Sequence, residues 1–180
     1  MCDDLRLIAP SDDMQETYED FLRDFRSTGE MLIPWVLDIE AESFPQLVRT
    51  LQGYCRGEGL RPGLVNASTY WLIDENRKLL AVSNLRHGLT PELRRAGGHV
   101  GYGVRPAERG KGYATQLLAL TLIEARKLGI ERALLVCDKA NLASAAVIRR
   151  NGGTLESEER LVEGNLVQRY WIDLSTRDVG

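Results

Sequence analysis

The sequence predicts an α/β fold, in which one central mixed β-sheet of about seven strands is flanked by about four helices. Short segments of alternating or continuous apolar residues have the spacing of strands, and other segments repeat apolar residues at helical spacing. The two kinds of segment interleave along 180 residues, a length that suits one domain with a substantial core. We therefore expect residues 1–180 to form a single domain.

The first half of the chain is predicted to contain one short strand, two helices and a hairpin. The alternating opening segment ends before Pro10, and Ser11 then offers a cap for a helix that runs to about Gly29. The turn-rich residues 74–76 join two runs of strand-forming residues, which is typical of a hairpin. The expected elements are a strand at 5–8, helices at 11–29 and 43–53, and strands at 69–73 and 79–83.

The second half of the chain has clearer boundaries. Gly129 is a natural C′ residue at the end of a long helix, and the continuous apolar run at 133–137 is typical of a buried central strand. Residues 163–165 indicate the turn of a closing hairpin. The expected elements are a strand at 99–104, a helix at 113–128, a strand at 133–137, a helix at 143–150, and strands at 161–162 and 167–172.

The composition, with 43% apolar and 27% charged residues, is that of a soluble globular protein. The acidic start does not resemble a secretory signal, and no apolar stretch approaches the length of about 20 residues that crosses a bilayer. We therefore expect a cytoplasmic protein with no membrane partner. Three widely spaced cysteines, Cys2, Cys55 and Cys137, with no Cys-x-x-Cys pair, argue against a disulfide framework and against a metal site.

Charge is distributed unevenly along the chain. Residues 1–60 hold 13 acidic and 5 basic side chains, a net charge of −8, whereas the remaining 13 acidic and 18 basic side chains give +5. An acidic front half suits an acceptor that carries an amine, and a basic back half suits an anionic cofactor; solvated surfaces of unequal composition would give the same pattern. Because the basic residues do not cluster with aromatic ones, we expect no nucleic-acid partner.

The segment at 104–114 carries the strongest chemical signal, because it lies between a predicted strand and a long predicted helix. Gly110 and Gly112 let the backbone approach a ligand closely, and successive N–H groups can point into one concavity. The start of the helix adds unpaired N–H donors and the positive end of the helix dipole. Together with the charges of Arg109 and Lys111, these features predict a loop that holds a pyrophosphate.

Spacing excludes two other phosphate-binding loops. A P-loop has four residues between its first glycine and its Gly-Lys pair. Here six residues separate Gly103 from Gly110, and Gly112 stands where a P-loop has Ser or Thr. A dinucleotide-binding fingerprint that began at Gly101 would place its third glycine at Pro106.

Residues 109–114 resemble the (Arg/Gln)-x-x-Gly-x-(Gly/Ala) signature of the GNAT acetyltransferases, and the order of elements from 5 to 174 is similar to that family. Segments 98–102, 148–153 and 169–172 resemble a bacterial subgroup known mainly as predicted acetyltransferases. The resemblance implies an N-acetyltransferase with acetyl-CoA as co-substrate, an amine as acceptor and no metal. It implies that the cofactor is bound by Gly103, Val104, Arg109, Gly110, Lys111, Gly112, Tyr113, Ala114, Asn141 and Ser144.

The resemblance also implies that the acceptor amine attacks the thioester directly, without a covalent enzyme intermediate. By analogy, the oxyanion is stabilised by the backbone N–H of Val104 or of a neighbour, whereas Pro106 has no N–H to offer. Gly101 and Gly103 are expected to leave room for the pantetheine arm beside their strand.

Proton transfer is assigned to three side chains. The family's usual acid is a tyrosine at a position that is Ile148 here, so we expect Tyr102, Ser144 or a bound water to protonate the departing thiolate. His99 is the expected general base, because an ordinary histidine pKa of about 6.5 suits proton removal near neutral pH; a structural hydrogen bond at a strand end is the alternative. His87 is expected on the acceptor side, with or without a function.

Two other functions remain open at this stage: a GNAT-fold domain that binds CoA as a sensor or scaffold without turnover, and an enzyme that uses a longer acyl-CoA. The acceptor pocket is expected in the least patterned region, residues 26–66. Its acidic bias favours a cationic amine such as a polyamine, an aminoglycoside or a basic peptide. A homodimer is a further expectation, because the closing hairpin offers an edge for pairing.

Overall fold

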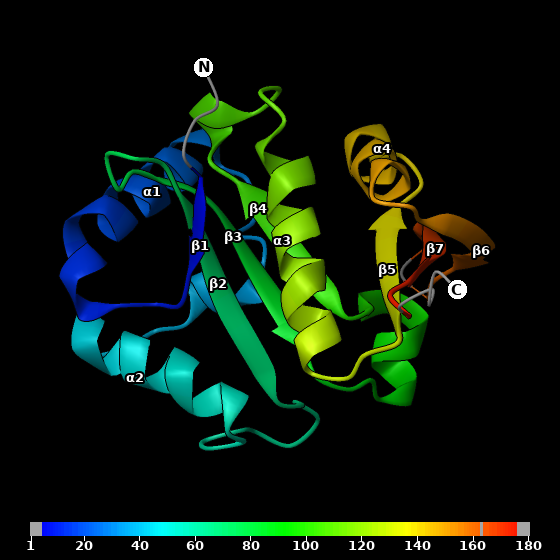
Figure 1. The fold of residues 1–180 in the computed structure, drawn as a ribbon, viewed down its shortest axis with the longest axis horizontal. Helices are drawn as coiled ribbons and strands as arrows, with labels where there is room; N and C mark the ends of the chain where they lie inside the picture. Colours follow the sequence, from blue (N-terminus) through cyan, green and yellow to red (C-terminus); the bar gives the residue numbers. More distant parts are fainter. Residues whose placement is uncertain (1–4, 163, 176–180) are drawn as a thin grey trace, which may run out of the picture.

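The computed structural model describes residues 5–162 and 164–175, and its elements follow the order expected from the sequence (Figure 1). The strands are β1 Arg6–Ile8, β2 Ala67–Ile73, β3 Leu79–Arg86, β4 Val100–Val104, β5 Arg132–Asp138, β6 Thr154–Arg160 and β7 Leu166–Asp173. The α-helices are α1 Gln15–Thr28, α2 Phe44–Cys55, α3 Tyr113–Lys127 and α4 Leu142–Arg150. Short helical turns lie at Asp12–Met14, Trp35–Asp38, Leu93–Gly97 and Pro106–Glu108. No helix in this part of the chain is long and apolar enough to cross a bilayer.

The predicted α/β class, with seven strands and four α-helices, is confirmed for the described residues, but the strands form two antiparallel sheets instead of one mixed sheet. The orders are β1-β2-β3-β4 and β5-β7-β6. The sheets meet where the N–H of His99 donates to the Leu134 carbonyl at 2.7 Å and the Leu134 N–H donates to Nδ1 of His99 at 2.9 Å. Beyond this contact β4 and β5 form no strand pairing in the described residues, so they belong to separate sheets.

Helices cover both faces of the four-stranded sheet. Adjacent residues of β2 show the division: Trp71 packs with α1 and α2, whereas Leu72 packs with Leu117 of α3. In Figure 1, α1 and α2 lie on the outer side of this sheet and α3 runs between it and the second sheet. The next residue of α3, Leu118, packs in the core of the second sheet, so one helix joins the two cores. This packing sets the position of the loop before α3.

The closing hairpin differs from its prediction. The strand predicted at 161–162 is wrong, because β6 spans Thr154–Arg160 and ends before Leu161. Most β6 side chains are polar and exposed, so the segment shows none of the apolar alternation that identifies a half-buried strand. Its pairing with β7 is decided by hydrogen bonds to a neighbouring strand, which periodicity does not report. Glu163, in the expected turn, lies outside the described residues.

Candidate functional site

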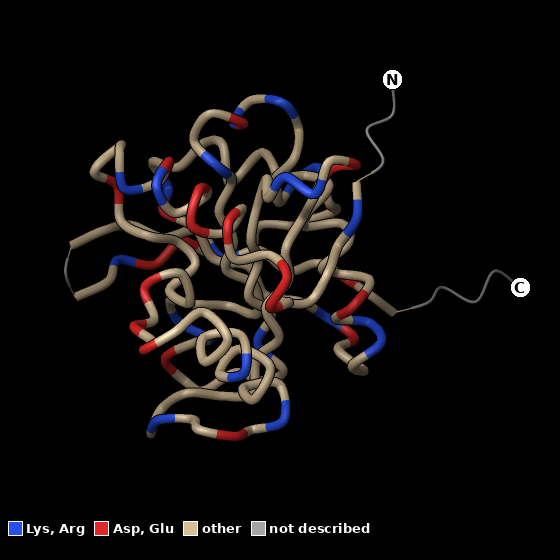
Figure 2. Tube along the Cα trace, turned by 90° about the vertical axis from the view of Figure 1, so that its left-hand side faces the viewer, with Lys and Arg blue, Asp and Glu red and all other residues tan. Residues whose placement is uncertain are grey.

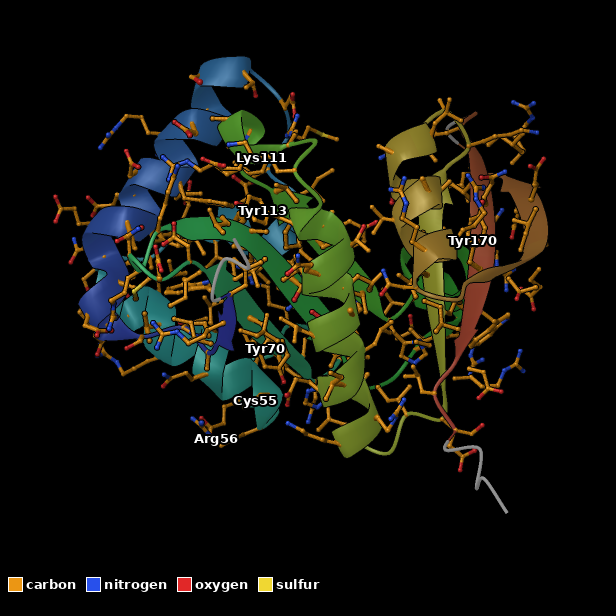
Figure 3. The ribbon with its side chains drawn as sticks, turned by 45° about the horizontal axis from the view of Figure 1, so that its top comes forward. Cys55, Arg56, Tyr70, Lys111, Tyr113 and Tyr170 are labelled. Atoms are coloured by element: carbon orange, nitrogen blue, oxygen red, sulfur yellow. The ribbon has the colours of Figure 1, made fainter. Side chains whose placement is uncertain are left out.

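The loop predicted to hold a pyrophosphate connects β4 to α3 and is attached to α1 by a buried arginine. Arg105 is 5% exposed, and its guanidinium pairs with Asp20 and Asp24 of α1. Figure 3 shows Lys111 and Tyr113 further along this loop, at the start of α3. The ion pairs of the buried Arg105 and the packing of α3 therefore hold both ends of the loop in place.

The backbone of the loop is open toward solvent. Gly110 and Gly112 have φ angles of +79° and +90°, and a Cβ at either would meet no other heavy atom within 4 Å beyond its chain neighbours. Their N–H groups and that of Ala114 donate to no atom of the residues described, and no side chain caps α3. A run of available amides at the positive end of a helix dipole is suited to an anion.

Both cations of the loop are paired with carboxylates. Nζ of Lys111 donates to Glu108 at 2.6 Å, and Glu108 also accepts from Lys78. Arg109 donates to both carboxylate oxygens of Glu30, at 2.7 and 2.9 Å. The hydrogen bond from Lys111, and then that from Lys78, lowers the pKa of Glu108, and the bond from Arg109 lowers that of Glu30. An anionic ligand would therefore share these cations with two ionised carboxylates.

Four ion pairs of the described residues join the acidic first part of the chain to the basic remainder. Figure 2 shows acidic and basic residues intermingled on the α1–α2 side of the molecule, not divided between two faces. Much of the charge asymmetry read from the sequence is thus neutralised by tertiary contacts. The pairs that cross are Asp13–Arg77, Asp20–Arg105, Asp24–Arg105 and Glu30–Arg109.

The two predicted proton donors lie together where β4, β5 and α4 meet. The hydroxyl of Tyr102 is 2.8 Å from Oγ of Ser144, which also hydrogen-bonds the thiol of Cys137. Burial raises the pKa of Tyr102 to about 12 and also raises that of Cys137, and the bonds to Ser144 oppose both shifts. All three groups are consequently protonated at neutral pH and can donate hydrogen bonds. Only the fold brings the thiol of Cys137, on β5, to Ser144.

Two further positions of α4 have structural roles. The side-chain oxygen of Asn141 accepts from the Ser144 N–H at 3.0 Å, which caps the helix and holds Ser144 in place. Ile148 is 1% exposed in the core of the second sheet. An apolar side chain therefore fills the position at which the resemblance implied a tyrosine acid.

The histidines and Arg86 are held by internal hydrogen bonds. Nδ1 of His99 accepts from Leu134, and burial, followed by Arg94 and Arg86, lowers its pKa to about 4. This geometry favours the structural alternative for His99 over a general base. Arg86 donates to the carbonyls of residues 97 and 98, and His87 lies 2.8 Å from a serine hydroxyl of β2. Among the described residues, no three His, Cys, Asp or Glu side chains are grouped to hold a metal ion.

The expected room beside Gly103 is filled by the protein itself. A Cβ on Gly103 would lie 2.0 Å from the carbonyl oxygen of Ile33, and a Cβ on Gly101 would lie 3.4 Å from Cβ of Pro34. The prediction that these glycines leave space for a pantetheine arm on this face of β4 is therefore wrong. Gly103 instead lets the segment between α1 and α2 lie directly on the strand.

A cavity of about 790 Å³ lies between the α1–α2 and α2–β2 connections. Every residue of its lining falls within 26–66, the region in which the acceptor pocket was predicted. The sequence predicted the region of this cavity but not the residues that line it. The acidic bias of residues 26–66 was the one signal of the kind of ligand it would bind. The polar and aromatic part of the lining consists of Glu30, Asp38, Glu40, Arg61, Trp35 and Tyr54.

Comparison with known proteins defines the class. The sequence matches the acetyltransferase (GNAT) domain family over residues 4–154. Because this match covers most of the chain, the protein belongs to the GNAT acetyltransferase family, and it is an acyltransferase with acetyl-CoA as donor. No curated protein matches the sequence.

Solved structures share the fold. An acetyltransferase from Salmonella typhimurium that modifies the N-terminal serine of ribosomal protein L7/L12 is 21% identical, with a TM-score of 0.66 and 97% of both chains covered. RimL, an L7/L12 α-N-protein acetyltransferase disulfide-bonded to coenzyme A, is 24% identical, with a TM-score of 0.66 over 96% of this chain and 95% of its own. A dodecameric spermidine N-acetyltransferase from Vibrio cholerae is 17% identical, with a TM-score of 0.62 over 95% and 94%.

Proposed function

We propose that this chain transfers the acetyl group of acetyl-CoA to an amine, with the pyrophosphate of the co-substrate held by residues 109–114. The observation that carries the proposal is the set of open amides at Gly110, Gly112 and Ala114, at the positive end of α3. Arg109 and Lys111 add two cations beside these donors. Backbone donors and paired cations together suit the two negatively charged phosphates of a pyrophosphate.

In the proposed reaction the nitrogen of the neutral amine bonds to the acetyl carbon and the carbon–sulfur bond breaks. The nitrogen then gives up one proton to water, and the departing thiolate takes up a proton. In this proposal the N–H of Val104 stabilises the oxyanion of the tetrahedral intermediate. The direction of this N–H follows from the hydrogen bonds at the two ends of the β3–β4 ladder. The Arg86 N–H donates to the carbonyl of His99, and the Arg105 N–H donates to the carbonyl of Leu80. Because bonded pairs alternate along an antiparallel ladder, the N–H of Val104 faces away from β3, toward the side on which β5 lies.

Tyr102 and Ser144 supply the proton in this proposal. The pKa of Tyr102, about 12, keeps its hydroxyl protonated, and its bond to Ser144 gives a path toward the sulfur. His99 becomes a positioning residue that holds β4 against β5, since its Nδ1 already accepts a backbone hydrogen bond. The acceptor amine therefore has to react in its neutral form, after losing a proton to water.

The test is calorimetric titration of acetyl-CoA, followed by an assay of thiol release over a panel of amines. Gly112→Leu should weaken acetyl-CoA binding at least tenfold, because the side chain and the lost φ angle both disturb the open amides. Gly129→Leu is the matched control: Gly129 has a φ of +79° at the far end of α3, where a Cβ also meets open space. Equal binding by the two variants would refute the pyrophosphate loop.

The same assay separates the other functions. Binding of acetyl-CoA without amine-dependent release across the panel would favour a sensor or scaffold, and faster release from longer acyl donors would favour a different acyltransferase. The homodimer stays a prediction. In the described sheet β6 pairs only with β7, so its outer edge is open, and light scattering of the full chain measures the association.

A further inference from the structure

The cavity between α1 and β2 has an excess of negative charge. Its lining contains the carboxylates of Glu30, Asp38 and Glu40, against the single guanidinium of Arg61. Glu30 is paired with Arg109 of the loop before α3. Within residues 5–162 and 164–175, Asp38 and Glu40 form no ion pair, so their charge is available to a ligand. An unbalanced negative lining favours a positively charged occupant.

An aromatic wall gives a second, independent indication of a ligand. Tyr54 lines the cavity and is 7% exposed, yet its hydroxyl forms no hydrogen bond to any residue that the structure describes. The hydroxyl is not one of the fully buried polar atoms, so it is open to water or to a ligand in the cavity. The Trp35 ring stands 6.0 Å from that of Tyr54, and aromatic faces bind ammonium groups.

The position and size of the cavity limit the occupant further. One wall is the segment after α1, whose Ile33 carbonyl rests against Gly103 of β4, the strand assigned to the thioester. The volume of about 790 Å³ lies within the usual range for small-molecule pockets, about 300–1,000 Å³. The cavity is also bounded on both sides by connecting segments and does not run along an open sheet edge, where an extended peptide would bind.

We propose that the acceptor is a small linear amine with a second positive charge, such as a diamine or polyamine. This inference rests on the proposed acetyltransferase function and names its substrate class. One ammonium group binds Asp38 and Glu40 in the cavity, with the rings of Trp35 and Tyr54 beside it. The other end of the molecule, as a neutral amine, reaches the thioester beside β4.

The experiment compares matched acceptors in the thiol-release assay on the full chain. 1,4-Diaminobutane and spermidine should show kcat/KM values at least tenfold above that of butylamine, which has the same carbon chain as the diamine but one charge. The double variant Asp38→Asn, Glu40→Gln should bring this ratio close to one without changing the dissociation constant of acetyl-CoA. Glu42→Gln is the control, because Glu42 is an exposed acid of the same connection outside the lining and should keep the ratio.

A second measurement titrates spermidine calorimetrically into the protein, with and without bound CoA. Binding that the double variant abolishes supports the cavity as its site even if no turnover is seen. If acetyl-CoA does not bind, the proposed function fails, and spermidine binding still decides the inference separately. The inference is overturned if spermidine does not bind, if butylamine and the diamine react equally, or if a lysine-rich peptide is acetylated and the diamine is not.

Discussion

The burial of His99 predicts that this histidine makes the stability of the fold depend on pH. The pKa of His99 falls from 6.5 in the unfolded chain to about 4 in the fold, because burial and two nearby arginines disfavour the charged ring. The unfolded chain therefore binds the proton more tightly, and the free energy of unfolding falls as the pH is lowered from about 6.5 toward 4. The two pKa values correspond to about 3 kcal/mol of stability lost across that window.

The assay is urea unfolding at pH values from 7 to 4.5, on the native chain and on His99→Asn. The asparagine oxygen can accept the Leu134 N–H but does not titrate, so this variant should lose stability at pH 7 and show a shallower decline on acidification. Subtracting the two curves removes the carboxylate contributions, which they share. His87→Asn is the control, because His87 is half-buried and should contribute less. Parallel curves for the native chain and His99→Asn would refute the reasoning.

Three further predictions concern the packing of β4, the loop before α3 and the proton donors. Gly103→Ala should destabilise the fold by at least about 2 kcal/mol in urea unfolding, because the new Cβ would lie 2.0 Å from the carbonyl oxygen of Ile33. Gly101→Ala is the control and should cost under about 1 kcal/mol, because its Cβ would lie 3.4 Å from the nearest atom. Glu30→Gln should tighten acetyl-CoA binding about two- to fivefold by calorimetry, because the half-exposed carboxylate that pairs with Arg109 no longer competes with the pyrophosphate. Ser144→Ala should lower kcat at least tenfold with little change in acetyl-CoA affinity, measured by thiol release and calorimetry; an unchanged kcat would remove the proton path.

Local sequence patterns predicted the order of the helices and strands and the loop at 109–114. The glycine spacing, the neighbouring cations and the helix that follows are all contiguous in the chain, so they can be read without the fold. The structure places positive φ angles at Gly110 and Gly112, where backbone freedom was expected. Strand β6 escaped detection because its polar side chains show no apolar alternation.

The partners of the site residues were beyond sequence reasoning. His99 matched a general base by its ordinary pKa, and only the fold shows its ring bonded to a strand that begins more than thirty residues later. Gly103 of β4 was expected to leave room for a ligand, but the carbonyl of Ile33 lies against it. In both cases the outcome depends on a contact between distant segments.

The sequence by itself determined the family and the α/β fold class, and it predicted a pyrophosphate loop, because each depends on residue types at short, fixed spacings. Tertiary structure alone decided that the strands divide into two sheets, that Tyr102 joins Ser144, and that Glu30 pairs with Arg109. It also decided which residues of 26–66 enclose a cavity. The physical reason is that burial, pKa and ion pairing arise from groups far apart in the chain, whose proximity exists only once the cores have packed.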